Sequence, residues 1–200
     1  MAGTINFGIL ISGGLYSSIR NVDGDIVECG VGAGRTFLIL AGLARDEGKK
    51  RTVWGFDSFE GFPEPSLYDA SIRNVKKGQL KLATPELIQQ YLLQRGKIEI
   101  HFLENNVKII SGFFENSLHQ FTGNSIALLH LDVDLYESYK TCLEVLWPKV
   151  AKGGVVLFDE YLNTAVKFPG AVKAIDEFFR DDKNLIKVDT TADRYYIFKQ

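Results

Sequence analysis

The order of short apolar runs and longer amphipathic segments constrains the fold of this chain more than any other feature of its sequence. The run 125–132 is almost continuously apolar, and segments with helical spacing of apolar residues separate it from other strand-like runs such as 25–29. Strands of this kind are buried on both faces, which is typical of parallel sheets covered by helices on each side. We predict strands at residues 25–29, 52–57, 107–113, 125–132, 154–159, 184–189 and 194–199, and helices at residues 34–43, 85–94, 115–121, 136–150 and 171–179.

The last two predicted strands indicate how the sheet ends. Only the polar turn 190–193 joins them, whereas a crossover between parallel strands needs about a dozen residues or more. The final strand must therefore run antiparallel beside its predecessor or close to it. The expected fold is a single Rossmann-like α/β domain over residues 1–200, with a mostly parallel seven-stranded sheet, an antiparallel last strand and helices on both faces.

Composition and charge indicate a soluble globular protein with a small-molecule partner. The formal net charge is -2, and no run of Lys and Arg is longer than residues 49–51, so neither nucleic acid nor a membrane is expected as a partner. Both cysteines lie in apolar runs, which favours buried free thiols over a disulfide or a cysteine metal site. We recognise no signal peptide or membrane-spanning run, which predicts a cytoplasmic location.

A glycine-rich turn follows the first predicted strand and leads into the first predicted helix. Gly30, Gly32 and Gly34 alternate along it. Glycines let the backbone turn sharply and approach a ligand closely, and the free N–H groups of the helix N-terminus face that ligand. Asp57 ends the next strand, where a carboxylate can accept both hydroxyls of a ribose. Together these residues predict a nucleoside-binding site, with a turn needed only for packing as the alternative.

An acidic residue interrupts the first predicted strand. Glu28 lies one residue before Cys29, where the strands of dinucleotide-binding folds are usually apolar. A buried carboxylate needs a partner, and the amino group of a methionine moiety is one that a ligand supplies. Glu28 therefore favours S-adenosylmethionine over NAD as the cofactor, with a structural hydrogen bond as an equal alternative.

Three predicted strands end on acidic residues, namely Asp57, Asp132 with Asp134 beside it, and Asp159 with Glu160. The carboxyl ends of parallel strands meet at one edge of an open sheet, and ligands bind there. Converging carboxylates repel one another unless a cation joins them, and Mg²⁺ prefers such hard oxygen ligands. We predict Asp132, Asp159 and Glu160 as metal ligands. Asp134 is a further candidate, and helix capping or exposure to water is the alternative for Asp134 and Glu160.

Such a metal would hold a substrate hydroxyl beside the sulfonium methyl of the cofactor and lower the pKa of that hydroxyl. Methyl transfer is an in-line displacement at carbon, so the protein mainly supplies orientation. Asp132 is the candidate catalytic residue because a carboxylate there can accept the proton of the hydroxyl.

A long irregular connection follows the second predicted strand. Residues 58–84 contain prolines, glycines and lysines and show no sustained periodicity. Long connections in compact domains are often lids or binding loops. We expect residues 58–96, which include the helix after this connection, to form a lid or acceptor-binding insertion.

Five segments resemble the macrocin O-methyltransferase family, which methylates sugar hydroxyls on antibiotics and related glycosides. The resemblance covers roughly residues 22–198. The segments are Val-Glu-Cys-Gly-Val (27–31), Phe-Asp-Ser-Phe-Glu-Gly-Phe-Pro (56–63), His-Leu-Asp-Val-Asp-Leu-Tyr-Glu-Ser (130–138), Gly-Gly-Val-Val-Leu-Phe-Asp-Glu-Tyr (153–161) and Pro-Gly-Ala-Val-Lys-Ala-Ile-Asp-Glu-Phe (169–178).

The resemblance implies a class I methyltransferase fold that uses S-adenosylmethionine and Mg²⁺. Asp132 matches the family's metal ligand and base. An Asp-Asp pair of the family matches Asp159 and Glu160, and here the second residue is one methylene longer.

Further positions follow from the same resemblance. Asp57 and Ser58 match the positions that contact the ribose, and Gly112 and Phe113 match a segment near the adenine. The family often has a longer N-terminal portion, so we expect an acceptor pocket that is more open or is completed by a second subunit of a homodimer.

Two other functions compete with a methyltransferase. Tyr136 and Lys140 form the Tyr-x-x-x-Lys pair that short-chain dehydrogenases use for proton transfer with NAD(P), and both lie on one face of the predicted helix. The glycine pattern, Glu28 and the final strand pair speak against that function. A non-catalytic protein that has kept the cofactor pocket is the second alternative.

Overall fold

The computed structural model describes residues 13–200, which contain a seven-stranded sheet of order β3-β2-β1-β4-β5-β7-β6. The strands are β1 (Asp25–Cys29), β2 (Val53–Asp57), β3 (Val107–Ser111), β4 (Ile126–Leu131), β5 (Val150–Phe158), β6 (Lys187–Asp189) and β7 (Arg194–Phe198). The pairs among β1 to β5 are parallel, and β7 runs antiparallel to both β5 and β6. This confirms the predicted Rossmann-like fold with its antiparallel last strand.

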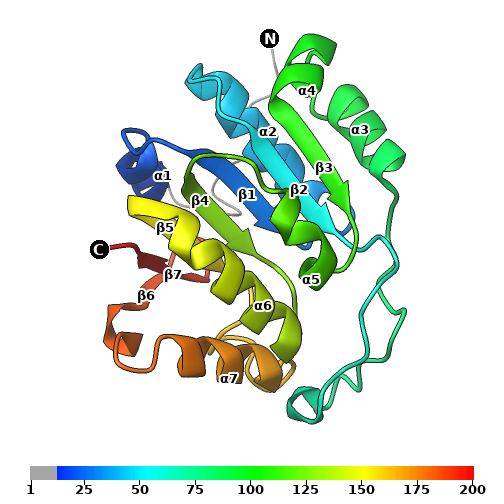
Figure 1. The fold of residues 1–200 in the computed structure, drawn as a ribbon, viewed down its shortest axis with the longest axis vertical. Coiled ribbons are helices and arrows are strands. Elements are labelled where there is room, and N and C mark those ends of the chain that lie inside the picture. The colour runs from blue at the N-terminus through cyan, green and yellow to red at the C-terminus, as the bar shows by residue number, and fades with distance from the viewer. Residues whose placement is uncertain (1–12) are drawn as a thin grey trace.

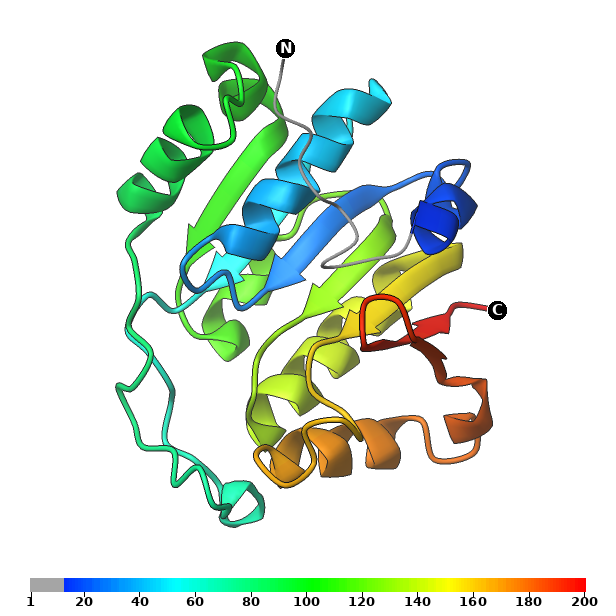
Figure 2. The ribbon, with the colours of Figure 1, turned by 180° about the vertical axis from the view of Figure 1, so that it is seen from behind.

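Helices cover both faces of the sheet. They are α1 (Gly13–Ile19), α2 (Arg35–Glu47), α3 (Pro85–Gln94), α4 (Ile100–Asn106), α5 (Phe114–Ser117), α6 (Tyr136–Leu146) and α7 (Pro169–Phe178). In Figure 1 α5, α6 and α7 lie in front of the sheet, and Figure 2 shows α1 and α2 on the opposite face. Each face thus has its own layer of helices, as the continuous apolar strands indicated.

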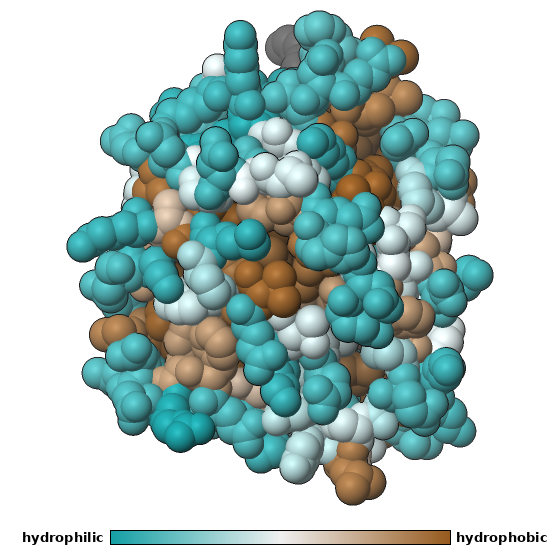
Figure 3. Space-filling view, in the orientation of Figure 1, coloured by the Kyte–Doolittle hydropathy of each residue, from teal (hydrophilic) through white to brown (hydrophobic). Residues whose placement is uncertain are grey.

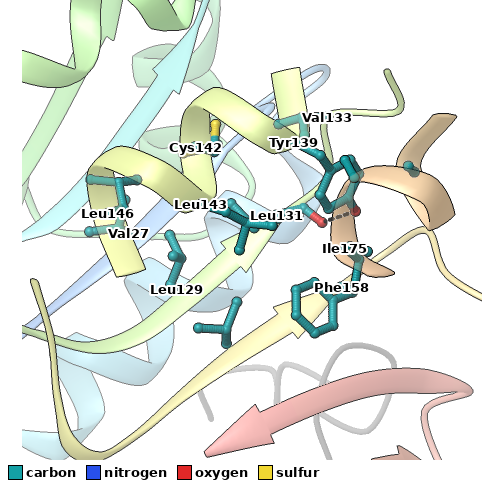
Figure 4. Packing of buried hydrophobic residues seen from close by; sticks show 14 of the residues in the cluster. Val27, Leu129, Leu131, Val133, Tyr139, Cys142, Leu143, Leu146, Phe158 and Ile175 are labelled. Atoms are coloured by element: carbon teal, nitrogen blue, oxygen red, sulfur yellow. Dashed lines mark hydrogen bonds between the residues drawn. The ribbon is translucent and has the colours of Figure 1, made fainter. Parts of the chain in front are cut away.

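Two hydrophobic clusters fill the space between the sheet and these layers. On one face Leu129, Leu131 and Phe158 of the sheet pack against α6 and α7, as Figure 4 shows. On the other face Ile26 and Leu157 pack with apolar side chains of α1, α2, α3 and α4. Alternate residues of a strand point to opposite faces, so every central strand contributes to both clusters.

The sequence patterns missed two helices and misplaced several ends. α1 begins with two glycines, and α4 has neither an N-cap side chain nor an acidic residue in its first turn, so neither carries the usual start signals. β5 begins at Val150, although the predicted helix 136–150 had included that residue. β3 ends at Ser111 because Gly112 has a φ of 133°, outside the range of a strand.

The connection between β2 and α3 runs as a long arm from the carboxyl edge of the sheet (Figures 1 and 2). We call residues 58–84 the 58–84 loop. Its regular structure is limited to a short 3₁₀ turn at Leu67–Asp69. α3 buries Ile88 and Leu92 against the body of the protein, so it belongs to the helical layer rather than to the arm.

The tip of the 58–84 loop exposes large apolar side chains. Leu67 is 94% exposed and Ile72 is 79% exposed. Figure 3 shows a mostly hydrophilic face with hydrophobic atoms in its centre and at its lower end, where the arm lies in Figure 1. Within residues 13–200, no helix combines the length and the apolar composition needed to cross a bilayer.

Candidate active site

The glycine turn between β1 and α2 has a backbone that other residues adopt only with strain. Gly30, Gly32 and Gly34 have φ values of 87°, 54° and 80°. A Cβ atom at Gly30 would lie 1.8 Å from the backbone oxygen of Asp132. Gly30 is therefore required both by its conformation and by the close approach of the chain after β4. The turn leads directly into α2, whose first N–H groups lack helical partners.

Asp57, the last residue of β2, is fixed beside this turn. Its Oδ2 accepts a hydrogen bond from the Gly32 N–H at 2.8 Å, and its Oδ1 accepts one from the Phe59 N–H at 2.7 Å. Phe59 has a φ of 54°, the left-handed conformation that brings its N–H back to the carboxylate. Both oxygens keep further lone pairs, so the carboxylate is held in place while it stays available to a ligand.

A cavity of about 480 Å³ extends from the glycine turn to the ends of β4 and the start of α6. Its walls bring together Gly30, Gly32, Asp57, Ser58 and Phe113, which are five of the predicted cofactor-binding residues. The other lining residues come from the glycine turn, α2, the 58–84 loop, α5, the β4–α6 connection and α6: Ala33, Arg35, Thr36, Gly61, Phe62, Pro63, Leu80, Leu82, Phe114, Glu115, Asp132, Val133, Asp134 and Ser138.

Three predicted cofactor residues lie outside this lining. Gly34 is next to Ile88 of α3, and a Cβ there would come within 2.9 Å of the Ile88 side chain. Gly112 lies behind Asp57, whose backbone oxygen accepts the Gly112 N–H at 2.9 Å. Glu28 is fully buried within the sheet. Gly34 and Gly112 therefore shape the wall from behind rather than form its surface.

Glu28 has a protein partner, His130 on the neighbouring strand β4. Glu28 Oε1 and His130 Nδ1 are 2.9 Å apart, and both side chains are fully buried. Burial and the nearby Asp132 carboxylate raise the pKa of Glu28 well above its usual value, and burial lowers the pKa of His130 to about 4. Glu28 Oε2 and His130 Nε2 have no hydrogen-bond partner among the described residues.

Asp132, Asp159 and Glu160 converge at the carboxyl edge of the sheet. One carboxylate oxygen from each lies within 4.8 Å of the other two. Asp132 follows β4, and Asp159 and Glu160 follow β5, so the parallel pairing of β4 and β5 brings the three side chains together. The cluster forms as the sequence predicted, although only Asp132 reaches the lining of the large cavity.

The electrostatics of this cluster fit a bound cation. Burial and the carboxylates of Asp159 and Asp134 raise the pKa of Asp132 well above its usual value. Burial followed by Asp132 raises the pKa of Glu160 in the same direction. Among the described residues one basic side chain makes an ion pair with the cluster, Arg194, whose Nη2 lies 2.8 Å from Asp159 Oδ1. One guanidinium cannot neutralise all the carboxylates of the cluster, and a divalent ion would neutralise the remaining negative charge.

Asp134 has an unusual backbone and faces the cavity. Its φ of 59° is rare for a residue other than glycine. Burial raises the pKa of its carboxyl to about 7. Its backbone N–H donates to Glu160 Oε2 at 3.3 Å, which ties the strained turn to the carboxylate cluster. Strained conformations of this kind are found preferentially at functional sites.

The 58–84 loop forms the outer wall of the cavity and is attached at its tip. Phe62, Leu80 and Leu82 line the cavity from this loop. At the tip Asp69 Oδ1 accepts the backbone N–H of Tyr136 at 2.8 Å. Leu135, the N-cap residue of α6, offers no side-chain hydrogen bond, so Asp69 caps this helix from a distant part of the chain.

Asp69, Tyr139 and Arg194 were not predicted as site residues from the sequence. Tyr139 contacts Glu160, and Arg194 contacts Asp159. Both contacts depend on how β5, β7 and α6 pack, and neither Tyr139 nor Arg194 lies in a motif. A turn-forming Ser-x-x-Asp at 66–69 was the one local signal for Asp69.

Comparison with known proteins gives the family. The model of the macrocin O-methyltransferase (TylF) family matches residues 17–197. The chain belongs to this family. The match includes the glycine turn, Asp57, the carboxylate cluster and the antiparallel β7.

Two curated relatives from Streptomyces are similar to this chain. The demethyldecarbamoylnovobiocin O-methyltransferase of Streptomyces niveus is 31% identical over 160 residues, which are 80% of this chain and 59% of that protein. The 8-demethyl-8-(2,3-dimethoxy-alpha-L-rhamnosyl)-tetracenomycin-C 4'-O-methyltransferase of Streptomyces olivaceus is 32% identical over 151 residues, which are 73% and 56% of the two chains. The matched part thus spans less than two thirds of either relative.

The solved structure of the O-methyltransferase NovP has a similar fold. It superimposes with a TM-score of 0.75 at 26% identity, over 94% of this chain and 78% of NovP. Together with the strand order, this similarity confirms a class I methyltransferase fold. A nucleotide-dependent dehydrogenase with a Rossmann sheet would continue with a parallel sixth strand beside β5, whereas here the antiparallel β7 occupies that place.

Proposed function

We propose that this protein is an S-adenosylmethionine-dependent, Mg²⁺-assisted O-methyltransferase that acts on a hydroxyl of a sugar or small natural product. The observation that carries this proposal is the single cavity that joins the glycine turn and Asp57 to Asp132 and Asp134. A nucleoside cofactor at one end and an acceptor hydroxyl at the other would share one chamber. The names of the relatives, O-methyltransferases of a novobiocin precursor and of a rhamnosyl tetracenomycin, support the reaction and the acceptor class.

The cofactor end is built from backbone groups and one carboxylate. Gly32 has no side chain that would stand between the turn and a nucleoside, and Asp57 offers its remaining lone pairs to ribose hydroxyls. Phe113 and Ser58 extend this surface. S-adenosylmethionine, when bound, supplies a methyl group on a positively charged sulfur. Glu28 would act indirectly by supporting the glycine turn. Its carboxyl and its partner His130 are buried behind the turn and do not lie at its surface.

The acceptor end is built from carboxylates. Asp132, Asp159 and Glu160 are the residues that would hold Mg²⁺. When bound, the metal would polarise the acceptor hydroxyl and make its proton easier to remove. Asp132 would accept this proton, as the sequence predicted, and Asp134 is a second candidate because it faces the cavity without belonging to the three-residue cluster.

The 58–84 loop would bind the acceptor and exclude water. Phe62, Leu80 and Leu82 give this wall an apolar character, which suits the ring faces and methyl groups of a glycoside while leaving hydroxyl recognition to the carboxylates. The single-domain organisation, the cytoplasmic location and the homodimer remain predictions.

Binding and turnover test the proposal together. Isothermal titration calorimetry should show S-adenosylhomocysteine binding to the protein, and mass spectrometry should show a gain of one methyl group on a glycoside acceptor incubated with S-adenosylmethionine. EDTA should abolish turnover, and added Mg²⁺ should restore it. Binding of NADH in place of S-adenosylhomocysteine would contradict the cofactor assignment, and full turnover after complete chelation would contradict the metal role.

A further inference from the structure

Asp159 has one of its two carboxylate oxygens occupied by a neighbouring side chain. Arg194 Nη2 lies 2.8 Å from Asp159 Oδ1. The same oxygen is 4.0 Å from Nε2 of the buried His130, so Oδ1 is turned toward the sheet. No hydrogen bond within the described residues reaches Oδ2. Asp159 therefore presents a single free oxygen to a ligand.

Glu160 is restricted in the same way. Its Oε2 accepts the Tyr139 hydroxyl at 2.8 Å and the backbone N–H of Asp134 at 3.3 Å. Tyr139 is fully buried in the core between β4 and α6, and its hydroxyl is also 3.0 Å from the backbone oxygen of Leu131, as Figure 4 shows. Packing and the contacts of its hydroxyl with Glu160 and Leu131 leave the Tyr139 side chain little freedom to move away. Glu160 Oε2 therefore stays occupied, and Glu160 Oε1 is free.

Arg194 reaches Asp159 because of the strand register. Phe158, the last residue of β5, lies opposite Tyr195 of the antiparallel β7. This register places Asp159, which follows β5, beside Arg194, the first residue of β7. The guanidinium lies against the sheet, and its Nε is buried. Asp132 differs from both of its neighbours, since no donor among residues 13–200 hydrogen-bonds to its carboxylate.

Carboxylates with one free oxygen favour a small cation. Mg²⁺ takes six ligands at short, regular distances and usually keeps several waters, whereas Ca²⁺ takes six to eight oxygens and often binds a carboxylate through both. Selectivity between the two ions thus depends on how many oxygens the protein can supply and how freely they move.

We propose that Arg194 and Tyr139 are positioning residues that each occupy one carboxylate oxygen, so that Asp159 and Glu160 bind through one oxygen each and the cluster prefers Mg²⁺ to Ca²⁺. This inference rests on the metal site of the proposed function and adds the basis of its ion selectivity. Arg194 acts through Asp159, and Tyr139 acts through Glu160.

Direct measurement of ion binding tests this role without relying on turnover. Isothermal titration calorimetry of the protein saturated with S-adenosylhomocysteine would give the dissociation constants of Mg²⁺ and Ca²⁺. The variants are Arg194→Met, which removes the donor, and Arg194→Lys, which keeps a charged donor. Arg95→Met is the matched control, because Arg95, the C-cap residue of α3, is an exposed arginine with the same charge.

We expect Arg194→Met to shift the ratio of the two dissociation constants toward Ca²⁺ by about tenfold, the lower end of the effects seen for groups that orient metal ligands. Arg194→Lys should keep most of the wild-type ratio, and Arg95→Met should keep all of it. Equal gains in affinity for both ions in Arg194→Met would overturn the proposal, because they would mean that the arginine acts only by its charge. An unchanged ratio would overturn it as well.

Tyr139→Phe provides a second and independent variant. It removes one hydroxyl from a buried ring, frees Glu160 Oε2 from its shorter hydrogen bond, and should also shift the ratio toward Ca²⁺. If Arg194→Met does not fold, this variant alone decides the question. If the wild-type protein binds S-adenosylhomocysteine but neither ion, the metal role and this inference both fail while the cofactor assignment stands.

Discussion

The two ends of the cavity are built in different ways. At the cofactor end the glycine turn and Asp57 are fixed by strand register and by backbone contacts, such as the approach of Gly30 to the backbone oxygen of Asp132. At the acceptor end the 58–84 loop extends away from the sheet and exposes Leu67 and Ile72 at its tip. Its attachment there depends on a few side-chain contacts, among which the hydrogen bond from Tyr136 N–H to Asp69 is buried.

The two ends therefore differ in how freely their residues can be substituted. Moving the glycine turn would disturb β1 and β4 together, so the cofactor end is constrained by the stability of the sheet. Changing residues of the 58–84 loop disturbs few buried contacts, and loops held in this way tolerate substitution. We infer that the family's common cofactor belongs to the rigid end and that acceptor choice belongs to the loop.

The largest effect should come from Asp132, a carboxylate that the sheet holds in place directly after β4. Asp132→Asn removes a charge from the cluster and a candidate proton acceptor, and we expect kcat to fall ~10³-fold, equivalent to about 4 kcal/mol. Binding of S-adenosylhomocysteine should stay close to wild type. Steady-state kinetics and calorimetry measure the two effects, with the exposed Asp181→Asn as control. Loss of cofactor affinity with unchanged kcat would reverse the assigned role.

Two glycine substitutions compare the rigidity of the two ends directly. Gly30 and Gly78 have φ values of 87° and 78°, but a Cβ at Gly30 would meet the Asp132 backbone at 1.8 Å while one at Gly78 would meet nothing within 4 Å. Gly30→Ala should lower the free energy of unfolding by more than about 3 kcal/mol, because strain and overlap combine. Gly78→Ala should cost only about 1–2 kcal/mol. Urea denaturation measures both, and equal losses would remove the contrast.

The smallest effect should come from detaching the loop. Asp69→Ala removes the carboxylate that accepts the Tyr136 N–H at the start of α6. This loss should lower the free energy of unfolding by about 1–2 kcal/mol. Because the loop would then cover the acceptor less well, KM for the acceptor should rise several-fold while kcat and cofactor binding change little. Glu64→Ala, an exposed acid of the same loop, is the control. A fall in kcat with unchanged KM would place Asp69 in the chemistry instead of in the attachment of the loop.

The sequence predicted most of the fold because its strands are marked locally. Apolar runs predicted all seven strands, and the short turn before Arg194 predicted the antiparallel pairing of β7. The helix α4 escaped prediction since it lacks a capping side chain. The end of β3 was misplaced for a different reason, because a strand pattern does not show that Gly112 adopts a positive φ.

The site was predictable only where a motif marks it. Gly30, Asp57 and Asp132 lie at strand ends, and topology brings strand ends together. The partner of Glu28 could not be identified, because the pairing of Glu28 with His130 joins residues 102 positions apart through the register of β1 and β4. Tyr139 and Arg194 depend on packing between elements in the same way, and no local pattern distinguishes them.

A crystal structure with S-adenosylhomocysteine and Mn²⁺ would show directly whether the cofactor and the metal share one cavity. Anomalous scattering would locate both the metal and the cofactor sulfur. We predict a manganese peak among Asp132, Asp159 and Glu160, with the sulfur in the cavity above the glycine turn and both bordering the same space. A sulfur or a manganese ion bound outside this cavity would contradict the account.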